Sequence, residues 1–157
     1  MKTIHSILAD MREQFRSIGL DTPELDARLL VQSILGISYE ETLLNSKRLV
    51  TDSECERLVS ATERRVKREP VSRILGTRPF WKSEFKVSPE TLDPRADSET
   101  LIEAVLAHCG EEPPSSIIDL GTGTGCLLLS LLQEFPQAAG MGVDISAGAV
   151  QTARQNA

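Results

Sequence analysis

Three glycines alternate with threonines between two apolar runs in the stretch SIIDLGTGTGCLLLSLL, residues 116–132. Glycine has no Cβ, so its backbone adopts positive φ at little cost and a ligand can lie directly against the main chain. The carboxylate of Asp119 stands two residues before Gly121, and a second carboxylate, Asp144, follows the next apolar run. This combination of bare main chain and two acids indicates a site for a small polar ligand.

The elements around the loop predict where it lies in the fold. The apolar run 117–120 predicts a buried strand, and residues 126–133 predict the helix after it. A second strand is expected near residues 141–143, and residues 144–146 open another helix. Strand, helix, strand and helix in this order start a doubly wound parallel sheet, in which ligands bind at the carboxyl ends of the strands.

Two known uses of such a loop fit the residues poorly. A phosphate-binding P-loop ends in Gly-Lys-Ser or Gly-Lys-Thr, whereas this loop ends in Gly125-Cys126-Leu127, which excludes that use. A dinucleotide site has the spacing GxGxxG, and here the third glycine comes one place early. The dinucleotide alternative is weakened but stays open.

The third use matches the whole pattern of acid-x-Gly-x-Gly-x-Gly, which resembles the S-adenosylmethionine loop of Rossmann-like methyltransferases. The methionine end of that cofactor is zwitterionic and its sulfur is cationic, so nearby carboxylates are tolerated. An acid after the second strand can accept hydrogen bonds from the ribose hydroxyls. The predicted cofactor-binding residues are Asp119, Gly121, Thr122, Gly123, Thr124, Gly125 and Asp144.

A purely structural interpretation also stays open for these residues. Glycines after a strand can serve only a tight turn, and residues 144–146 can serve only to begin a helix. Cys126 at the helix start has either a lowered thiol pKa or a role as small buried filler.

The front of the chain has helical signals. Ile4, Ile7, Leu8, Met11, Phe15 and Ile18 form one apolar face of a helix that ends at Gly19. Thr22-Pro23 predicts an N-cap and first helical position, and that helix ends at Gly36. Capping boxes at 38–41 and 51–54 begin two more helices, the first to about residue 44 and the second to about residue 68. Residues 1–75 are therefore predicted to form a helical bundle.

The pattern changes after Pro70. Aromatic and β-branched residues on both sides of 82–84 predict a hairpin within residues 76–95. Asp97 or Ser98 is expected to cap a helix that ends at Gly110, and a linker at 111–114 precedes the first strand of the sheet. The predicted domains are the helical bundle 1–75, the hairpin linker 76–95 and an α/β domain over 96–157.

Composition limits the classes of function. The chain has 157 residues and a net charge of −6, which argues mildly against a nucleic-acid binder. Residues 1–95 hold 16 basic and 15 acidic side chains, whereas 96–157 hold one basic and eight acidic. Three cysteines without CxxC spacing, and His5 and His108 without suitable neighbours, predict no metal site and no disulfide framework. A cytoplasmic protein without a membrane span is expected.

The whole chain resembles the peptide chain release factor glutamine methyltransferases, often called the HemK type. The resemblance rests on LDARLLVQSILG, on REPVSRILGTRPFWKSEFKVSPETLDPRADSET, on IIDLGTGTGC and on GVDIS. Its most specific part is the join at residues 69–100. One departure is Ala96, where the family usually has proline after the preceding arginine.

The resemblance implies methyl transfer from S-adenosylmethionine to the side-chain amide nitrogen of glutamine in the Gly-Gly-Gln motif of class 1 release factors. The fold it implies is a helical bundle, which would recognise the substrate, then a hairpin and the start of a Rossmann-like methyltransferase domain. The family's catalytic Asn-Pro-Pro-Tyr motif is absent, because the only asparagines, Asn45 and Asn156, do not precede proline. We therefore assign no catalytic residue, and expect the chain to be the front portion of a longer enzyme.

Two alternatives remain for function. One keeps methyl transfer but changes the acceptor to another protein glutamine or a nucleic-acid amino group. The other is a non-catalytic module that docks a partner through residues 1–95, where cations could face an acidic protein. These cations are Arg57, Arg64, Arg65, Lys67, Arg68 and Arg73. A solvated helix face would have the same composition.

We expect the 157-residue chain by itself to transfer no methyl group and to bind the cofactor weakly at best, because it lacks the acceptor-positioning motif. The purified chain would be incubated with methyl-labelled S-adenosylmethionine and a class 1 release factor. Robust turnover would contradict this expectation.

Overall fold

The computed structural model describes residues 2–110 and 112–157, and the chain divides into two compact units, Met1–Leu75 and Gly76–Ala157. Each unit has its own hydrophobic core. The hairpin segment clusters with the second unit. Glu111, the first residue of the predicted linker, lies outside the described residues. The roles predicted for the three segments stay predictions.

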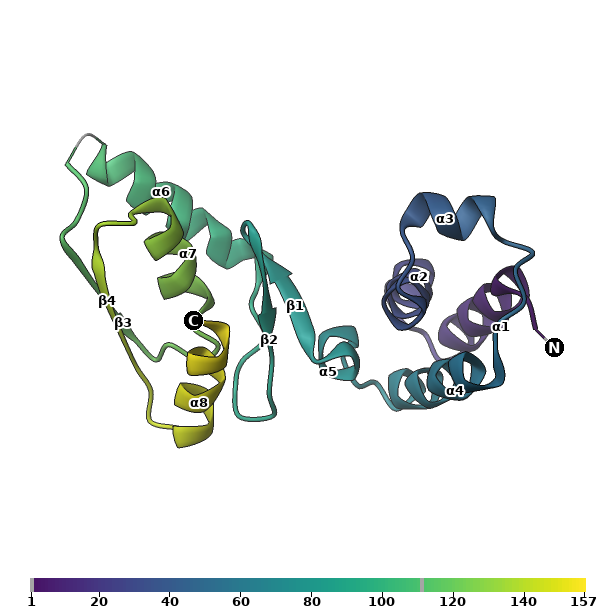
Figure 1. Cartoon of the computed structure of the whole chain (residues 1–157). Coiled ribbons are helices and arrows are strands. Elements are labelled where there is room, and N and C mark those ends of the chain that lie inside the picture. Colours follow the sequence, from purple (N-terminus) through teal and green to yellow (C-terminus); the bar gives the residue numbers. More distant parts are fainter. Residues whose placement is uncertain (1, 111) are drawn as a thin grey trace. The chain divides into compact units, whose positions relative to one another are not determined.

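The first unit is helical, as predicted (Figure 1). Its helices are α1 (Ile4–Ser17), α2 (Pro23–Leu35), α3 (Tyr39–Leu44), α4 (Asp52–Val66) and α5 (Val71–Leu75). Both predicted capping boxes are present, at the starts of α3 and α4, and Thr3 with Ser6 forms a third at α1. Thr22 is the N-cap residue of α2, but its hydroxyl donates to Asp26 Oδ1 instead of accepting from the helix.

A small apolar core and a buried ion pair stabilise this unit. Phe15, Leu30 and Leu58 are at most 1% exposed. Full burial of such a side chain contributes about 2 kcal/mol. Arg65 of α4 donates from Nε to Asp26 Oδ2 of α2 at 2.8 Å, and both side chains are largely removed from solvent. The pair therefore fixes α4 against α2.

The second unit begins with a hairpin and continues as alternating helices and strands. Its elements are β1 (Thr77–Phe80), β2 (Ser83–Lys86), a 3-10 helix (Ala96–Ser98), α6 (Glu99–Cys109), β3 (Ser116–Leu120), α7 (Cys126–Glu134), β4 (Ala139–Val143) and α8 (Ala147–Asn156). The antiparallel hairpin is confirmed, with Thr77 opposite Lys86 and Phe80 opposite Ser83. The predicted side-chain cap of α6 is wrong. The chain enters α6 from the 3-10 turn with Ser98 already helical, and among the described residues no side chain caps the helix.

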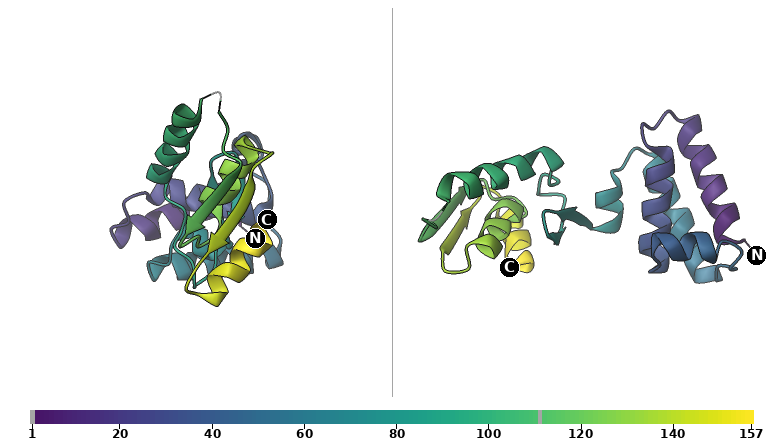
Figure 2. Two further views of the ribbon diagram at one scale, coloured as in Figure 1. Left: turned by 90° about the vertical axis from the view of Figure 1, so that its left-hand side faces the viewer. Right: turned by 90° about the horizontal axis from the view of Figure 1, so that it is seen from above.

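Strands β3 and β4 are parallel and in register from Ser116 beside Ala139 to Leu120 beside Val143. Helices α7 and α8 lie on the same side of the pair (Figure 2). The strand predicted at residues 117–120 is confirmed, but the prediction that it is buried is wrong. Ile118 and Leu120 are 65% and 79% exposed, because within the described residues β3 pairs only with β4 and its second face is uncovered.

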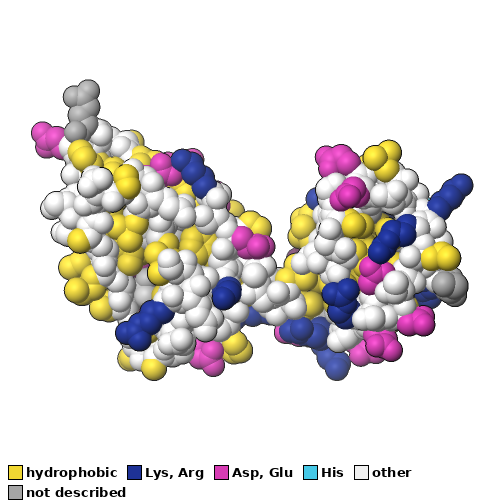
Figure 3. Space-filling view, viewed as in Figure 1, with side chains coloured by type: hydrophobic (Ala, Val, Ile, Leu, Met, Phe, Trp, Pro, Cys, Tyr) yellow, Lys and Arg dark blue, Asp and Glu magenta, His cyan; other side chains and the backbone are white. Residues whose placement is uncertain are grey.

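Apolar side chains contribute broadly to the surface of the second unit. The exposed apolar residues of the two strands are Ile118, Leu120, Met141 and Val143. Side chains alternate between the faces of a strand, so these four share the face away from α7. Figure 3 shows hydrophobic side chains spread over the visible face of this unit, with few charged ones among them.

The hairpin packs onto α6 and α7. Phe80 and Phe85 meet edge to face, with ring centroids 6.2 Å apart, and pack with Ile102 and the end of α7 in the core. At the turn, Trp81 donates from its main-chain N–H to Glu99 and from Nε1 to Glu134. Lys82 also pairs with Glu134 at 2.6 Å, and these contacts lower the pKa of that carboxyl, the lysine contributing most. The hairpin is thus part of the second core.

We predict that Asp26→Ala destabilises the first unit by about 3 kcal/mol, because it leaves the Arg65 guanidinium buried without its partner. Asp21→Ala is the matched control, since Asp21 is exposed at the same end of α2. Urea unfolding followed by far-ultraviolet circular dichroism measures the loss. Trp81, the only tryptophan, reports the second unit separately and its transition should not move. Equal midpoints for the two variants would contradict the prediction.

Candidate functional site

The glycine loop lies at the carboxyl ends of both parallel strands. It leaves β3 after Leu120 and enters α7 at Cys126. The main-chain N–H groups of Gly121 and Thr122 both donate to Val143 O, at 2.8 and 2.9 Å. These bonds hold the start of the loop against the end of β4, next to Asp144.

The two predicted acids are both bonded to the loop. Asp144 accepts from Ser146 N–H and from Gly123 N–H, each at 2.9 Å, and these donors lower its carboxyl pKa, Ser146 contributing most. Asp119 Oδ2 accepts from Thr122 Oγ1 at 2.8 Å. The structural role that the sequence left open for Asp144 is therefore present. A carboxylate has about four lone-pair sites, so it still has acceptor capacity for a ligand.

The glycines of the loop differ in their surroundings. All three have positive φ, between +56° and +80°. A Cβ on Gly121 would meet no heavy atom within 4 Å, and one on Gly123 would meet only a carbonyl oxygen at 4.0 Å. A Cβ on Gly125 would lie 3.2 Å from both Ala153 and Leu129. The first two glycines therefore face open space, whereas the third lets α8 pack against the loop.

The two threonines face inward. Thr122 and Thr124 are 6% and 2% exposed. Beside the bond to Asp119, Thr122 lies so close to β4 that a Cβ on Gly142 would meet its Oγ1 at 2.8 Å. Thr124 Oγ1 accepts from Cys126 N–H at 3.3 Å. The structure thus brings all seven predicted residues together: five form the loop, and the two acids flank it. The threonine side chains, however, stabilise the loop and do not face its open side.

Sequence reasoning missed two neighbours of this loop. Asn156, at the end of α8, donates from Nδ2 to Thr124 O at 2.9 Å. The two residues are 32 positions apart and belong to no common motif, so no sequence pattern could have paired them. Gly142 is the other missed neighbour, and its single-residue signal, a glycine inside a strand, was available.

A hollow of about 320 Å³ lies behind the loop, between α7, β4 and α8. It borders Thr122 and Gly125, and among its other lining residues are Leu132, Val150 and Ala153. Neither predicted acid lines it. The open side of Gly121 and Gly123, where Asp144 lies, is therefore distinct from this apolar hollow.

The surroundings of Cys126 favour the role of small filler. Burial raises the pKa of its thiol, whereas the other alternative required a lowered value. Within the described residues, no group of three or more His, Cys, Asp or Glu side chains is placed to hold a metal ion. None of the described helices is both long enough and apolar enough to cross a membrane.

The basic cluster of the first unit is largely used by the fold. Arg64 pairs with Glu69 and donates to the carbonyl oxygens of Arg73 and Ile74. Arg65 pairs with Asp26, as described above, and Arg68 donates to Ile18 O. Charge reversal at these three arginines would therefore disturb the fold before it tested docking.

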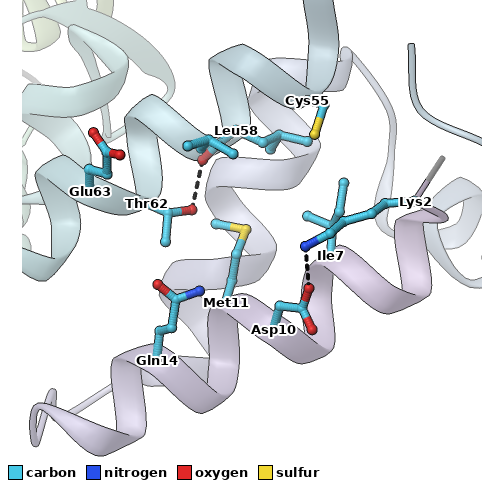
Figure 4. A pocket seen from close by; sticks show the side chains of 10 residues that line it. Lys2, Ile7, Asp10, Met11, Gln14, Cys55, Leu58, Thr62 and Glu63 are labelled. Carbon is cyan, nitrogen blue, oxygen red and sulfur yellow. Dashed lines mark hydrogen bonds and ion pairs between the residues drawn. The ribbon is translucent and has the colours of Figure 1, made fainter. Parts of the chain in front are cut away.

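A separate pocket of about 160 Å³ opens between α1 and α4 of the first unit (Figure 4). Lys2 and Asp10 form an ion pair at its edge, with Nζ and Oδ2 2.6 Å apart. Met11 and Leu58 contribute apolar walls. The hydroxyl of Thr62, which also lines the pocket, donates to the Leu58 carbonyl oxygen. No feature of this pocket matches the predicted cofactor chemistry.

Comparisons with known proteins agree with the architecture. Residues 6–76 match the family described as PrmC N-terminal domain, and residues 111–157 match a family described as methyltransferase domain. The fold is therefore a helical N-terminal region followed by part of a Rossmann-like methyltransferase domain.

Curated relatives carry the name release factor glutamine methyltransferase. The chain is 49% identical over 142 residues to the one from Rhodospirillum rubrum, covering 88% of this chain and 42% of the relative. It is 41% and 40% identical to those from Bradyrhizobium diazoefficiens and Agrobacterium fabrum, covering 99% of this chain and 54% and 55% of the relatives. The resemblance to the release factor glutamine methyltransferases is confirmed, and the chain spans about half the length of these relatives.

We predict that Gly125→Ala lowers the stability of the second unit more than Gly121→Ala does. Both substitutions place a Cβ at positive φ, which costs about 1 kcal/mol. Only the alanine at 125 also presses on Ala153 and Leu129, and such overpacking adds about 1–3 kcal/mol. Urea unfolding followed by Trp81 fluorescence measures both. Equal losses, or a larger loss at 121, would contradict the packing role of Gly125.

Proposed function

We propose that the loop between β3 and α7 binds S-adenosylmethionine, with Gly121 and Gly123 beneath the cofactor and Asp144 at its ribose. The observation that carries this proposal is the open side of the loop, where two glycines leave main chain uncovered beside a carboxylate. The match of residues 111–157 to a methyltransferase domain supports it.

The residues present fit this cofactor. The N–H donors on Asp144 favour its ionised form, so it can accept hydrogen bonds from ribose hydroxyls at neutral pH. The loop has no lysine to bind a phosphate, and Asp119 would repel one. A zwitterionic, cationic ligand is compatible with both acids.

We further propose that a protein carrying this chain methylates the glutamine side chain of the Gly-Gly-Gln motif in class 1 release factors. The names of the relatives support this choice of acceptor. The cofactor, when bound, supplies an electrophilic methyl group on its sulfonium. An amide nitrogen is a weak nucleophile because its lone pair is delocalised, so the protein contributes mainly by positioning the reactants.

In that reaction the residues described here would act on the donor side. The loop after β3 would hold the cofactor, and Asp144 at the end of β4 would accept hydrogen bonds from its sugar. Gly121 and Gly123 must stay without side chains, because a methyl group would occupy the ligand's volume.

We predict that Gly123→Ala and Asp144→Asn each weaken binding of S-adenosylhomocysteine at least about tenfold, which corresponds to about 1.4 kcal/mol. The alanine places a methyl group in the volume of the ligand, and the asparagine loses the charged acceptor of the ribose hydroxyls. Titration calorimetry at pH 8 and at pH 5.5 measures the affinity. Because the carboxyl pKa of Asp144 is lowered, the wild type should keep its affinity across this interval. Ser115→Ala, an exposed change before β3, is the control. Unchanged affinity in both site variants would contradict the proposal.

The acceptor is tested with a protein that carries this chain and methyl-labelled S-adenosylmethionine. We expect label in a class 1 release factor and none in the same factor with Gly-Gly-Gln changed to Gly-Gly-Glu, which lacks the amide nitrogen. Label in the altered factor, or preferential label in DNA or RNA, would overturn the proposed acceptor and favour the alternatives.

A further inference from the structure

One face of helix α8 contacts the segment 86–90, at the end of the hairpin. The residues on this face are at positions 148, 152 and 156, which are four apart and therefore lie on the same side of the helix. A Cβ on Gly148 would meet Glu90 Cγ at 2.7 Å, and Thr152 Oγ1 donates to Ser88 Oγ at 2.9 Å. Asn156 is the last member, and it contacts Lys86. The helix thus runs antiparallel to residues 86–90.

Asn156 pairs with the backbone of β2 as another strand would. Its Oδ1 accepts from Lys86 N–H at 2.8 Å, and its Nδ2 donates to Lys86 O at 3.1 Å. A side-chain amide has one acceptor oxygen and two N–H donors. The second donor goes to Thr124 O at 2.9 Å. One carboxamide therefore joins the hairpin edge to the glycine loop.

This contact differs from the others that hold the loop. Val143 O, Asp144 and Asp119 bind its first half, from Gly121 to Gly123, and all belong to β3 or β4 and the residue after it. Its second half, Thr124 and Gly125, rests on α8 through Asn156 and Ala153. Since Thr124 is 2% exposed, its carbonyl needs a partner, and Asn156 supplies it.

We propose that Asn156 is a positioning residue for cofactor binding, which fixes the Thr124 carbonyl and thereby the height of the glycine loop relative to the hairpin. This inference rests on the proposed function of the loop. It assigns a role to a side chain that does not itself touch the cofactor. Through Lys86, the role links the hairpin segment to the cofactor loop.

Asn156→Asp distinguishes the bond that the Asn156 side chain accepts from the two bonds that it donates. The aspartate keeps an acceptor for Lys86 N–H but loses the donors to Lys86 O and Thr124 O. Asn156→Leu loses all three bonds. Gln155→Glu adds the same charge at the neighbouring exposed position of α8 and is the matched control. Amide hydrogen exchange by NMR and calorimetric titration with S-adenosylhomocysteine are measured on the wild-type chain and on the three variants.

In Asn156→Asp we expect Lys86 N–H to stay protected, while Gly125 and Cys126 N–H exchange faster and affinity for S-adenosylhomocysteine falls about tenfold. In Asn156→Leu, Lys86 N–H should also lose protection, and Gln155→Glu should resemble the wild type. The positioning role is overturned if Asn156→Asp binds S-adenosylhomocysteine as tightly as the wild type does. It is equally overturned if affinity falls only in the variant whose Lys86 N–H loses protection.

The outcomes also separate this inference from the proposed function. If the wild type does not bind S-adenosylhomocysteine, the proposed function of the loop fails. The exchange of Gly125 and Cys126 N–H then still decides whether Asn156 holds the loop. Unchanged exchange at these two amides in Asn156→Asp would overturn the inference in that case as well.

Discussion

The hydrogen bonds that join the glycine loop to the end of β4 are the interaction on which the site depends. A loop that offers bare main chain to a ligand has no side chains on that side to stabilise it. Its conformation must therefore be fixed by hydrogen bonds from residues on its other side. Val143 O holds Gly121 and Thr122, and Asp144 holds Gly123. Without these bonds, Gly121 and Gly123, both at positive φ, would have no fixed conformation.

Asp144 shows how one residue serves both the fold and the proposed chemistry. Its contacts with Gly123 N–H and Ser146 N–H place it and keep it ionised, and an ionised carboxylate is the acceptor that a ribose requires. The structural and functional interpretations of this residue are therefore not exclusive. The same holds for Gly125, whose missing side chain serves the packing of α8.

Local signals in the sequence predicted local structure well. The capping boxes of α3 and α4 were predictable because each is a bond between residues three positions apart. The burial of β3 was not, since exposure depends on what covers each face and not on the strand's own residues. The predicted side-chain cap of α6 was wrong for a related reason. A 3-10 turn precedes the helix, so the chain is already helical at Ser98 and has no extended residue directly before α6 to serve as a cap. Asn156 reaches Lys86 and Thr124 across 70 and 32 residues, a distance that no sequence pattern spans.

The central claim is that the open side of the loop binds S-adenosylmethionine. Its most direct test is an NMR titration of the isotope-labelled chain with S-adenosylhomocysteine. The account predicts that the amide signals of Gly121, Gly123 and Ile145 shift together, and that those lining the α1–α4 pocket stay in place. Shifts confined to that pocket or to the hollow behind the loop, with the signals of Gly121 and Gly123 unchanged, would contradict it.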